Sequence, residues 1–400
     1  MRIIVFGNTN NYPLRLVQAL RKLGHDAVLV VERREPLHRP ESVHPEFHEG
    51  RYPEWIVDFS YLSEDDYVGP SPRIGQVISL LESADALILN SLGPSLLEYV
   101  DKPAIAFLTG SDLNYYANYT TVSYRASGHD PAFRRSAAAR LDSRLWTDFI
   151  QRQREGILKS KAVSYFHRGI VPSDDVLLDE IGVSDEQRFF IYMCHDLPDK
   201  APNIPDKQYP RIFCGTRLTW KKPIPPGASP LDYKGSDIMI RGVGRFHRSN
   251  RLPFEFRIFE KGMHVKETKA LAEKEGLENK IAWLSEMPLH KFYEELAAAD
   301  VCIEQLGESC IGMVGLDAMA MGKPVIGNAH PEIWQRHLKE EWPICQATTP
   351  EEVESHLHYL LTDPGLRQHI GRRSRAFVLR HFSPKANARK CLDILTKKRT

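Results

Sequence analysis

Short apolar runs alternate with longer amphipathic stretches in the first part of the chain. Residues 3–6 form such a run, and after a polar turn the apolar residues between 14 and 23 recur at helical spacing. Further apolar runs occupy residues 27–31, 86–89 and 104–108. Continuous apolar strands are typical of sheets covered on both faces, so the pattern predicts a parallel β-sheet with helices on both sides.

The same alternation restarts after a proline-rich stretch. Residues 196–211 contain four prolines, which is typical of an extended linker. Apolar runs then follow at 212–214, 256–259, 281–284, 301–303 and 325–326. Because 400 residues are too many for one core, we predict two Rossmann-like domains, residues 1–197 and 198–382, followed by a C-terminal helix within 383–400.

Composition narrows the functional classes. Hydrophobic residues make up 42% and charged residues 26% of the chain, as in globular proteins, and a net charge of +1 argues against a nucleic-acid binder. No apolar run reaches the roughly 20 residues of a membrane span, and the N-terminus lacks the pattern of a signal peptide. The six cysteines lack paired spacing. We therefore expect reduced thiols, a cytoplasmic location and no metal cluster.

Residues 312–327, with the sequence GMVGLDAMAMGKPVIG, carry the strongest chemical signal. A glycine turn opens a short helix that bears Asp317, and Gly322 ends this helix before an apolar strand. A glycine loop at a helix start offers free N–H groups to a phosphate, and the carboxylate one turn later can accept hydrogen bonds from sugar hydroxyls. The pattern is equally consistent with an ordinary helix–strand unit in which Asp317 is solvated.

This segment resembles the donor-site helix of retaining GT-B glycosyltransferases, the group 1 family that includes glycogen synthase and sucrose synthase. That family has two glutamates eight positions apart. Asp317 falls on the second, which holds the nucleotide ribose, and Ser309, with Glu308 beside it, falls on the first, which contacts the donor sugar. The resemblance implies a GT-B fold, with two Rossmann-like domains facing a cleft and a C-terminal helix crossing back to the first. It also implies that the donor is contacted by Gly312, Met313 and Val314.

A second motif follows the apolar run 212–214. Gly215 and Arg217 come directly after it, and Lys234 precedes the next predicted helix. This arrangement resembles the family motif in which an arginine and a lysine hold the donor diphosphate. The departing nucleoside diphosphate gains negative charge, which fixed cations stabilise. Arg217 and Lys234 are thus the predicted catalytic cations, although each alone is also consistent with a solvated charge, and an intervening insertion adds Lys221 and Lys222 as competing candidates.

The loop after residues 104–108 supplies the predicted acceptor side. Thr109 and Gly110 fall where the family often has His-Gly, the histidine reaching the donor sugar. Asp112 is predicted to orient or deprotonate the acceptor hydroxyl, with capping of the following helix as the alternative.

Two further loops complete the predicted site. Asn8 and Asn10 lie in the first loop, where amides suit hydroxyl-rich ligands but are also ordinary turn residues. Glu286 and Met287 fall on the loop that, in the family, holds the nucleobase through backbone groups.

Residues 134–168 form a basic helical segment, with nine Lys or Arg against three Asp or Glu. One interpretation is a peripheral patch at the inner membrane face, which would meet anionic lipid or a lipid-diphosphate acceptor. The other is a solvated helix whose apolar stripe lies in the core.

The resemblance implies transfer of a sugar, with retention, from a nucleoside diphosphate sugar to a hydroxyl of a glycan or lipid-linked saccharide, in glycan or glycoconjugate biosynthesis. It implies no metal and no other cofactor. Three alternatives stay open: a sugar-nucleotide epimerase of the same fold, an inactive sugar-nucleotide-binding relative, and a two-lobed binding protein.

Overall fold

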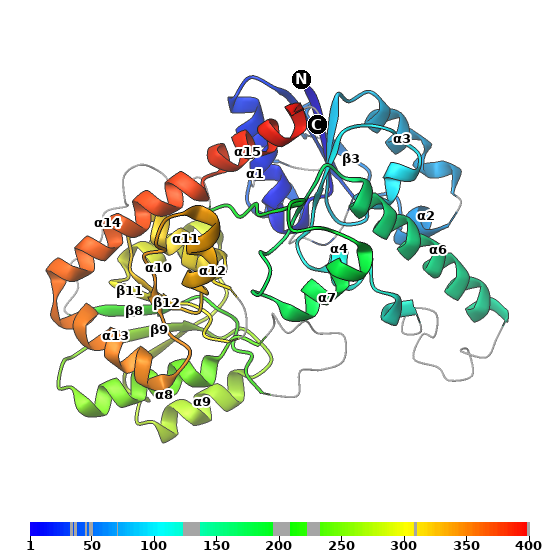
Figure 1. Cartoon of the computed structure of the whole chain (residues 1–400). Coiled ribbons are helices and arrows are strands. Elements are labelled where there is room, and N and C mark those ends of the chain that lie inside the picture. The colour runs from blue at the N-terminus through cyan, green and yellow to red at the C-terminus, as the bar shows by residue number, and fades with distance from the viewer. Residues whose placement is uncertain are drawn as a thin grey trace. The chain divides into compact units, whose positions relative to one another are not determined.

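The computed structural model of the protein contains two compact units, one formed by Met1–Tyr192 with Pro384–Thr400 and the other by Met193–Ser383 (Figure 1). The structure describes residues 1–32, 35, 38–44, 46–47, 51–69, 71–122, 137–194, 209–221, 233–307 and 310–397, without the side chains of 137–141. Most of the proline-rich stretch predicted as a linker lies outside these ranges.

The first unit is built on a seven-stranded sheet with the order β3-β2-β1-β4-β5-β6-β7. All pairs in this sheet are parallel. The strand order reverses between β1 and β4, which is the position where ligands bind in open α/β sheets. The strands are β1 Arg2–Phe6, β2 Asp26–Val31, β3 Ile56–Asp58, β4 Ala86–Leu89, β5 Ala104–Phe107, β6 Ala162–Ser164 and β7 Arg188–Phe189.

Helices cover this sheet and bury its apolar residues. Trp146, Phe149 and Ile150 of the long helix α6 pack into the same core as the strand residues Ile4, Val30 and Leu87. The helices are α1 Tyr12–Lys22, α2 Glu64–Val68, α3 Gly75–Glu82, α4 Ser111–Asn114, α6 Ala137–Lys159, α7 Pro172–Ile181 and α15 Pro384–Thr396.

The C-terminal helix α15 returns to the first unit and packs against α1. Lys161 Nζ donates to the carbonyl oxygens of Leu395 at 3.1 Å and Lys397 at 2.7 Å. The Asn387 amide donates to the carbonyl of Tyr192 at 2.9 Å. The crossover helix expected from the resemblance is therefore present.

The second unit repeats the plan with six parallel strands in the order β10-β9-β8-β11-β12-β13. Here the order reverses between β8 and β11. Figure 1 shows α8 and α9 on one face of this sheet and α10 and α11 on the other. Two Rossmann-like sheets confirm the predicted fold class. The elements are β8 Arg211–Cys214, α8 Ser236–Ser249, β9 Glu255–Phe259, α9 Val265–Lys274, β10 Ile281–Leu284, α10 Leu289–Ala298, β11 Val301–Ile303, α11 Met313–Ala320, β12 Val325–Gly327, α12 Pro331–Leu338, β13 Cys345–Gln346, α13 Pro350–Thr362 and α14 Pro364–His381.

Three chain-wide features complete the description. All six cysteines are buried free thiols, as their spacing predicted. Within the described ranges, no helix has the length and apolarity needed to cross a membrane. No group of three or more His, Cys, Asp or Glu side chains in this part of the chain is placed to hold a metal ion.

Candidate functional site

The loop after β8 lies against the start of α11 in the second unit. A Cβ on Gly215 would lie 2.9 Å from the Phe292 ring and 3.1 Å from the Val314 side chain. Only glycine therefore allows this approach without displacing its neighbours. The structure thus brings together two predicted donor-site residues, Gly215 and Val314, that are almost one hundred positions apart.

Lys234 is joined to the same edge of the sheet by backbone hydrogen bonds. Its N–H donates to the Thr219 carbonyl at 2.7 Å, and its own carbonyl accepts from the Leu306 N–H at 2.9 Å. The Thr219 N–H in turn donates to the Arg217 carbonyl at 3.0 Å. The side chain of Lys234 is half-buried and that of Arg217 is exposed. The two predicted cations are therefore carried by segments that are bonded to each other at the carboxyl edge of β8 and β11.

Gly235 makes this junction possible. It precedes α8 in the left-handed region, with φ of 66°, and a Cβ there would lie 2.8 Å from the Gly307 nitrogen. A left-handed conformation combined with so close a backbone contact requires glycine. The segment that bears Lys234 thus packs directly against the loop that follows β11.

The glycine loop predicted to meet the donor phosphates opens α11. Gly312 is the N-cap residue, and no side chain in the described part of the chain caps this helix. Gly312, Met313 and Val314 are half-buried. Glu308 and Ser309 lie outside the described residues, so their contact with the donor sugar stays a prediction.

A buried carboxylate that we did not predict, Glu304, holds this loop. It follows β11 and is 4% exposed. Its Oε2 accepts the Gly312 N–H at 2.7 Å, and its Oε1 accepts the Thr216 hydroxyl at 3.3 Å. Burial raises the pKa of the Glu304 carboxyl, whereas the Gly312 N–H and the charge of Lys234 oppose that rise. The sequence signal for Glu304 is a charged residue that directly follows an apolar strand.

Asp317, the predicted ribose ligand, is buried rather than solvated. It lies on α11 with 2% of its surface exposed, and its Oδ2 accepts the Tyr293 hydroxyl at 3.4 Å. The interpretation of Asp317 as an ordinary solvated helix residue is therefore wrong. A contact between Asp317 and a ribose stays a prediction.

The predicted nucleobase loop follows β10. The Glu286 side chain is exposed and forms an ion pair with Lys261 after β9. The hydrogen bond from Lys261 lowers the pKa of the Glu286 carboxyl. Met287 beside it is half-buried. The Lys261–Glu286 ion pair joins the segments that follow β9 and β10. Recognition of a base by the backbone of this loop remains a prediction.

In the first unit, Asn90 joins the loops at the switch point. Its Oδ1 accepts the Thr9 N–H at 3.1 Å, and its Nδ2 donates to the Phe107 carbonyl at 2.8 Å and to Asp112 Oδ2 at 2.9 Å. Asn90 is fully buried. This residue, which we did not predict, therefore ties together the segments that follow β1, β4 and β5.

Asp112 is fully buried and serves its own loop. Its carboxylate accepts the Thr109 N–H at 2.7 and 2.9 Å, the Gly110 N–H at 2.8 Å and the Thr109 hydroxyl at 3.1 Å. Burial raises the pKa of Asp112, and these hydrogen bonds act in the opposite direction. Both oxygens bind N–H groups that precede the short helix α4. This geometry favours a structural role, and we assign Asp112 no proton transfer.

The two predicted asparagines of the first loop, Asn8 and Asn10, differ in burial. The Asn8 amide is buried, and it donates to Asn11 Oδ1 at 2.7 Å and to the His38 carbonyl at 2.8 Å. Its Oδ1 accepts the Leu14 N–H at 3.1 Å. Asn8 thus holds the turn, in agreement with the ordinary-turn alternative. Asn10 is exposed with φ of 53°, so of the two it is the one whose side chain is accessible to a ligand.

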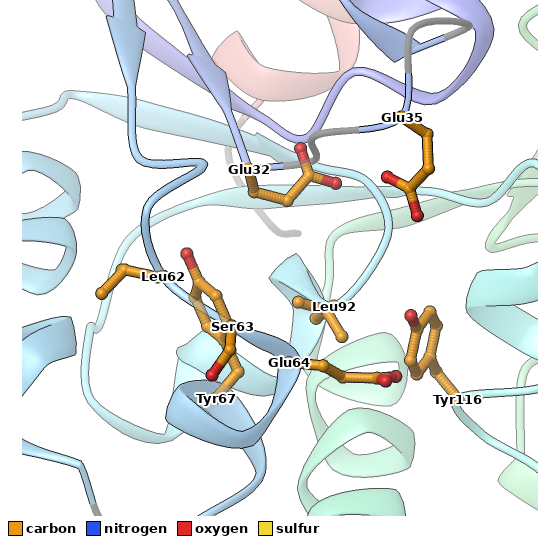
Figure 2. Close-up of a pocket in the computed structure, with 8 residues that line it drawn as sticks. All are labelled: Glu32, Glu35, Leu62, Ser63, Glu64, Tyr67, Leu92 and Tyr116. Atoms are coloured by element: carbon orange, nitrogen blue, oxygen red, sulfur yellow. The ribbon is translucent and has the colours of Figure 1, made fainter.

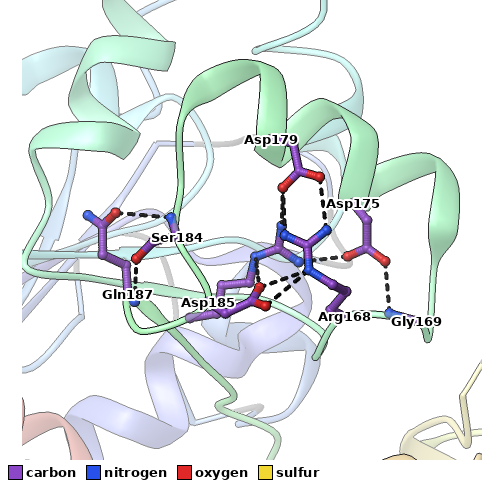
Figure 3. A network of polar contacts seen from close by, with 8 residues as sticks. Arg168, Gly169, Asp175, Asp179, Ser184, Asp185 and Gln187 are labelled. Atoms are coloured by element: carbon purple, nitrogen blue, oxygen red, sulfur yellow. Dashed lines mark hydrogen bonds and ion pairs between the residues drawn. The ribbon is translucent and has the colours of Figure 1, made fainter.

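Three arginines of the basic segment pair with carboxylates within the first unit. Arg152 pairs with Glu98 at 3.1 Å, and Arg154 pairs with Glu180 at 3.6 Å. Figure 3 shows Arg168 bonded to Asp179 and Asp185. With its apolar residues in the core, the segment fits the solvated-helix alternative. The membrane contact stays a prediction, because Arg134, Arg135 and the side chain of Arg140 lie outside the described residues.

One family model matches part of the second unit. Residues 230–377, which include Lys234, Glu304, the glycine loop and Asp317, match the family described as glycosyl transferases group 1. This confirms, for that part of the chain, the resemblance found in the sequence. The chain has no match among curated protein sequences.

Solved structures share the complete two-unit fold. HepE from Anabaena, crystallised in complex with UDP and glucose, is 15% identical, with full coverage of both chains and a TM-score of 0.60. Sucrose-phosphate synthase from Thermosynechococcus elongatus is 12% identical, with 98% of each chain covered and a TM-score of 0.56. A putative UDP-N-acetylglucosamine 2-epimerase from Listeria monocytogenes is 13% identical, with 98% and 94% covered and a TM-score of 0.51. At these identities the likeness establishes the GT-B fold.

Substitution of Glu304 tests the role of the buried carboxylate. Glu304→Ala leaves the Gly312 N–H and the Thr216 hydroxyl without their acceptor, so we expect a loss of about 1–3 kcal/mol in stability. Urea unfolding measures this loss. Glu273→Ala, at an exposed position of α9, is the control and should change stability by less than about 0.5 kcal/mol. Equal stability of Glu304→Ala and the control would contradict the role.

Proposed function

We propose that this protein is a glycosyltransferase that moves a sugar from a nucleoside diphosphate sugar to an acceptor hydroxyl. One observation carries the proposal. The loop after β8, the start of α8 and the glycine loop of α11 are bonded together at the carboxyl edge of the second sheet. Two of these three segments lie within the region that matches the glycosyltransferase family. The match supports the reaction class, and the geometry supports these segments as the ones that would perform it.

The chemistry follows from the charge that the leaving group develops. When the bond between sugar and diphosphate breaks, the nucleoside diphosphate gains negative charge. Arg217, Lys234 and the N–H groups at the start of α11 would stabilise that charge, and a preorganised arrangement is the most effective kind of stabilisation. Asp317 would hold the ribose.

Retention of the anomeric configuration is part of the proposal, on the strength of the family resemblance. The acceptor hydroxyl would attack from the face that the diphosphate leaves. The protein then needs no covalent nucleophile, and the rate enhancement comes from positioning and electrostatics. We propose a saccharide, free or lipid-linked, as the acceptor.

An epimerase can have the same fold, so the fold alone does not distinguish it from a transferase. The distinction must come from the chemistry of the residues. An epimerase moves protons at a sugar carbon and needs carboxylates or histidines for that purpose. Asp112 and Glu304 are engaged in hydrogen bonds with backbone N–H groups of their own loops, which makes them poor proton carriers. These two carboxylates therefore give no support to the epimerase. Product analysis by NMR separates the two, since a transferase releases nucleoside diphosphate and an epimerase yields a second nucleotide sugar.

The cation pair provides the direct test of the proposed mechanism. Arg217→Ala and Lys234→Ala should each lower turnover of the donor by two to three orders of magnitude, which corresponds to about 3–4 kcal/mol of transition-state stabilisation. Release of nucleoside diphosphate measures turnover. Lys274→Ala, at an exposed position on α9, is the matched control and should keep normal activity. Near-normal turnover in both test variants would exclude the proposed diphosphate site.

Nucleotide binding without a sugar tests Asp317 separately. Asp317→Asn should weaken binding of UDP, ADP or GDP, whichever the wild type prefers, by about tenfold or more, because hydrogen bonds to a charged group contribute about 1.5–3 kcal/mol. Isothermal titration measures the affinity. Tyr293→Phe removes the long hydrogen bond to Asp317 and should retain most of the nucleotide affinity. If the asparagine variant binds nucleotide as well as the wild type, Asp317 does not contact the ribose.

Chelation tests the source of positive charge in the reaction. Lysine and arginine would supply the cations that divalent metals supply elsewhere, so donor turnover should be unchanged in EDTA. An assay before and after chelation, with readdition of Mg²⁺ or Mn²⁺, decides this point. Activity that is lost on chelation and restored by either metal would contradict the proposed mechanism.

A further inference from the structure

The first unit contains a pocket of about 300 Å³ at the carboxyl edge of its sheet. Glu32 comes directly after β2, Leu62 to Tyr67 come after β3, and Leu92 comes after β4. Loops at this edge are where an open parallel sheet binds ligands. The volume is at the lower end of the range for small-molecule sites, which suits a ligand of monosaccharide size.

Three of the eight described residues that line this pocket are glutamates. Figure 2 shows Glu32, Glu35 and Glu64 around it, the first two from the segment after β2 and the third from the start of α2. None of the eight described residues that line it is basic. Glu32 is 6% exposed and accepts the Asn8 N–H at 3.2 Å. A cation in this cavity would be attracted by the carboxylates that line it.

The hydroxyl of Tyr67 independently indicates a polar ligand. Tyr67 lines the pocket and is 3% exposed, and its hydroxyl has no hydrogen-bond partner among the described residues. A buried hydroxyl without a partner costs free energy that a ligand hydroxyl or ammonium would recover. Burial and the charge of Glu32 raise the pKa of Tyr67, so the phenol stays protonated and can donate.

An aromatic wall adds to the selectivity of the pocket. Tyr116 lines it and is 8% exposed. Tyrosine rings attract cations through their negative faces and also pack against the apolar face of a sugar ring. Carboxylates, a phenol and a second tyrosine together are suited to a polyhydroxylated ligand with a positive charge.

We propose that this pocket binds the acceptor and that the acceptor carries a protonated amine beside its hydroxyls, as amino sugars and aminocyclitols do. The identification with an acceptor rests on the proposed glycosyltransferase function, whereas the preference for an amine rests on the pocket alone. The same carboxylates would repel an anionic acceptor such as a lipid diphosphate. Arg33 and Arg34 lie outside the described residues, so the test includes an anionic probe.

Three monosaccharide probes that differ in charge test this preference. Binding of glucosamine, N-acetylglucosamine and glucose 6-phosphate to the full-length protein is measured by isothermal titration at low salt. Glucosamine should bind at least about tenfold more tightly than either of the others, because N-acetylglucosamine lacks the positive charge and glucose 6-phosphate is an anion.

Variants connect this preference to the pocket. Glu64→Gln and Tyr67→Phe should each reduce glucosamine affinity, the former by about tenfold, and leave thermal stability close to that of the wild type. Glu64 is half-buried, so we expect its substitution to disturb folding less than a substitution of the buried Glu32. Glu82→Gln, at an exposed position on α3, is the charge-matched control and should bind normally.

The outcomes are distinct. Equal affinity for the three probes, a preference for glucose 6-phosphate, or glucosamine binding that Glu64→Gln does not change would overturn the inference. Donor turnover is measured in parallel. If turnover depends on Lys234 but glucosamine shows no preference, only the amine inference fails. If glucosamine binds through Glu64 and no donor is turned over, the glycosyltransferase proposal fails and the pocket stands.

Discussion

The buried carboxylate of Glu304 organises the carboxyl edge of the second sheet. A charge in the protein interior is tolerated only when it is hydrogen-bonded. Glu304 meets this requirement with the Gly312 N–H and the Thr216 hydroxyl. The β8 loop and the glycine loop must therefore lie on either side of it. A Cβ on Gly312 would lie 2.6 Å from Glu304 Oε1, so a larger residue at that position would have to displace the carboxylate.

In the first unit, the buried side chains of Asn90 and Asp112 hold the loops in a similar way. Their side chains satisfy N–H groups of the loops after β1 and β5, as Glu304 does in the other sheet. Buried polar side chains thus fix the loop geometry in both units. Asp112, which the sequence suggested for acid–base chemistry, is consequently occupied with structure. This leaves the cations and the helix start as the groups available for the proposed reaction.

Local patterns in the sequence predicted the elements that depend on local information. Apolar runs located the long strands, and the glycine-rich segment located α11 because its motif is contiguous. Glu304 and Asn90 escaped prediction because their partners come from loops that only the folded sheet brings together. Arg152 and Arg168 suggested a cationic surface because their acidic partners also lie outside the segment in which the charges were counted. These partners, Glu98 and Asp185, are not among residues 134–168. Strands of two residues, such as β7, are too short to show periodicity.

The two proposed sites are opposite in charge, and this opposition has a functional consequence. Arg217 and Lys234 favour a diphosphate, whereas Glu32, Glu35 and Glu64 line a pocket that disfavours one. A transferase must keep its donor out of the acceptor site, or donor molecules would compete with the acceptor at high concentration. Carboxylates in the acceptor pocket achieve that exclusion by repulsion, without any steric barrier. The acceptor must then be neutral or cationic, so the charge that excludes the donor also selects the acceptor.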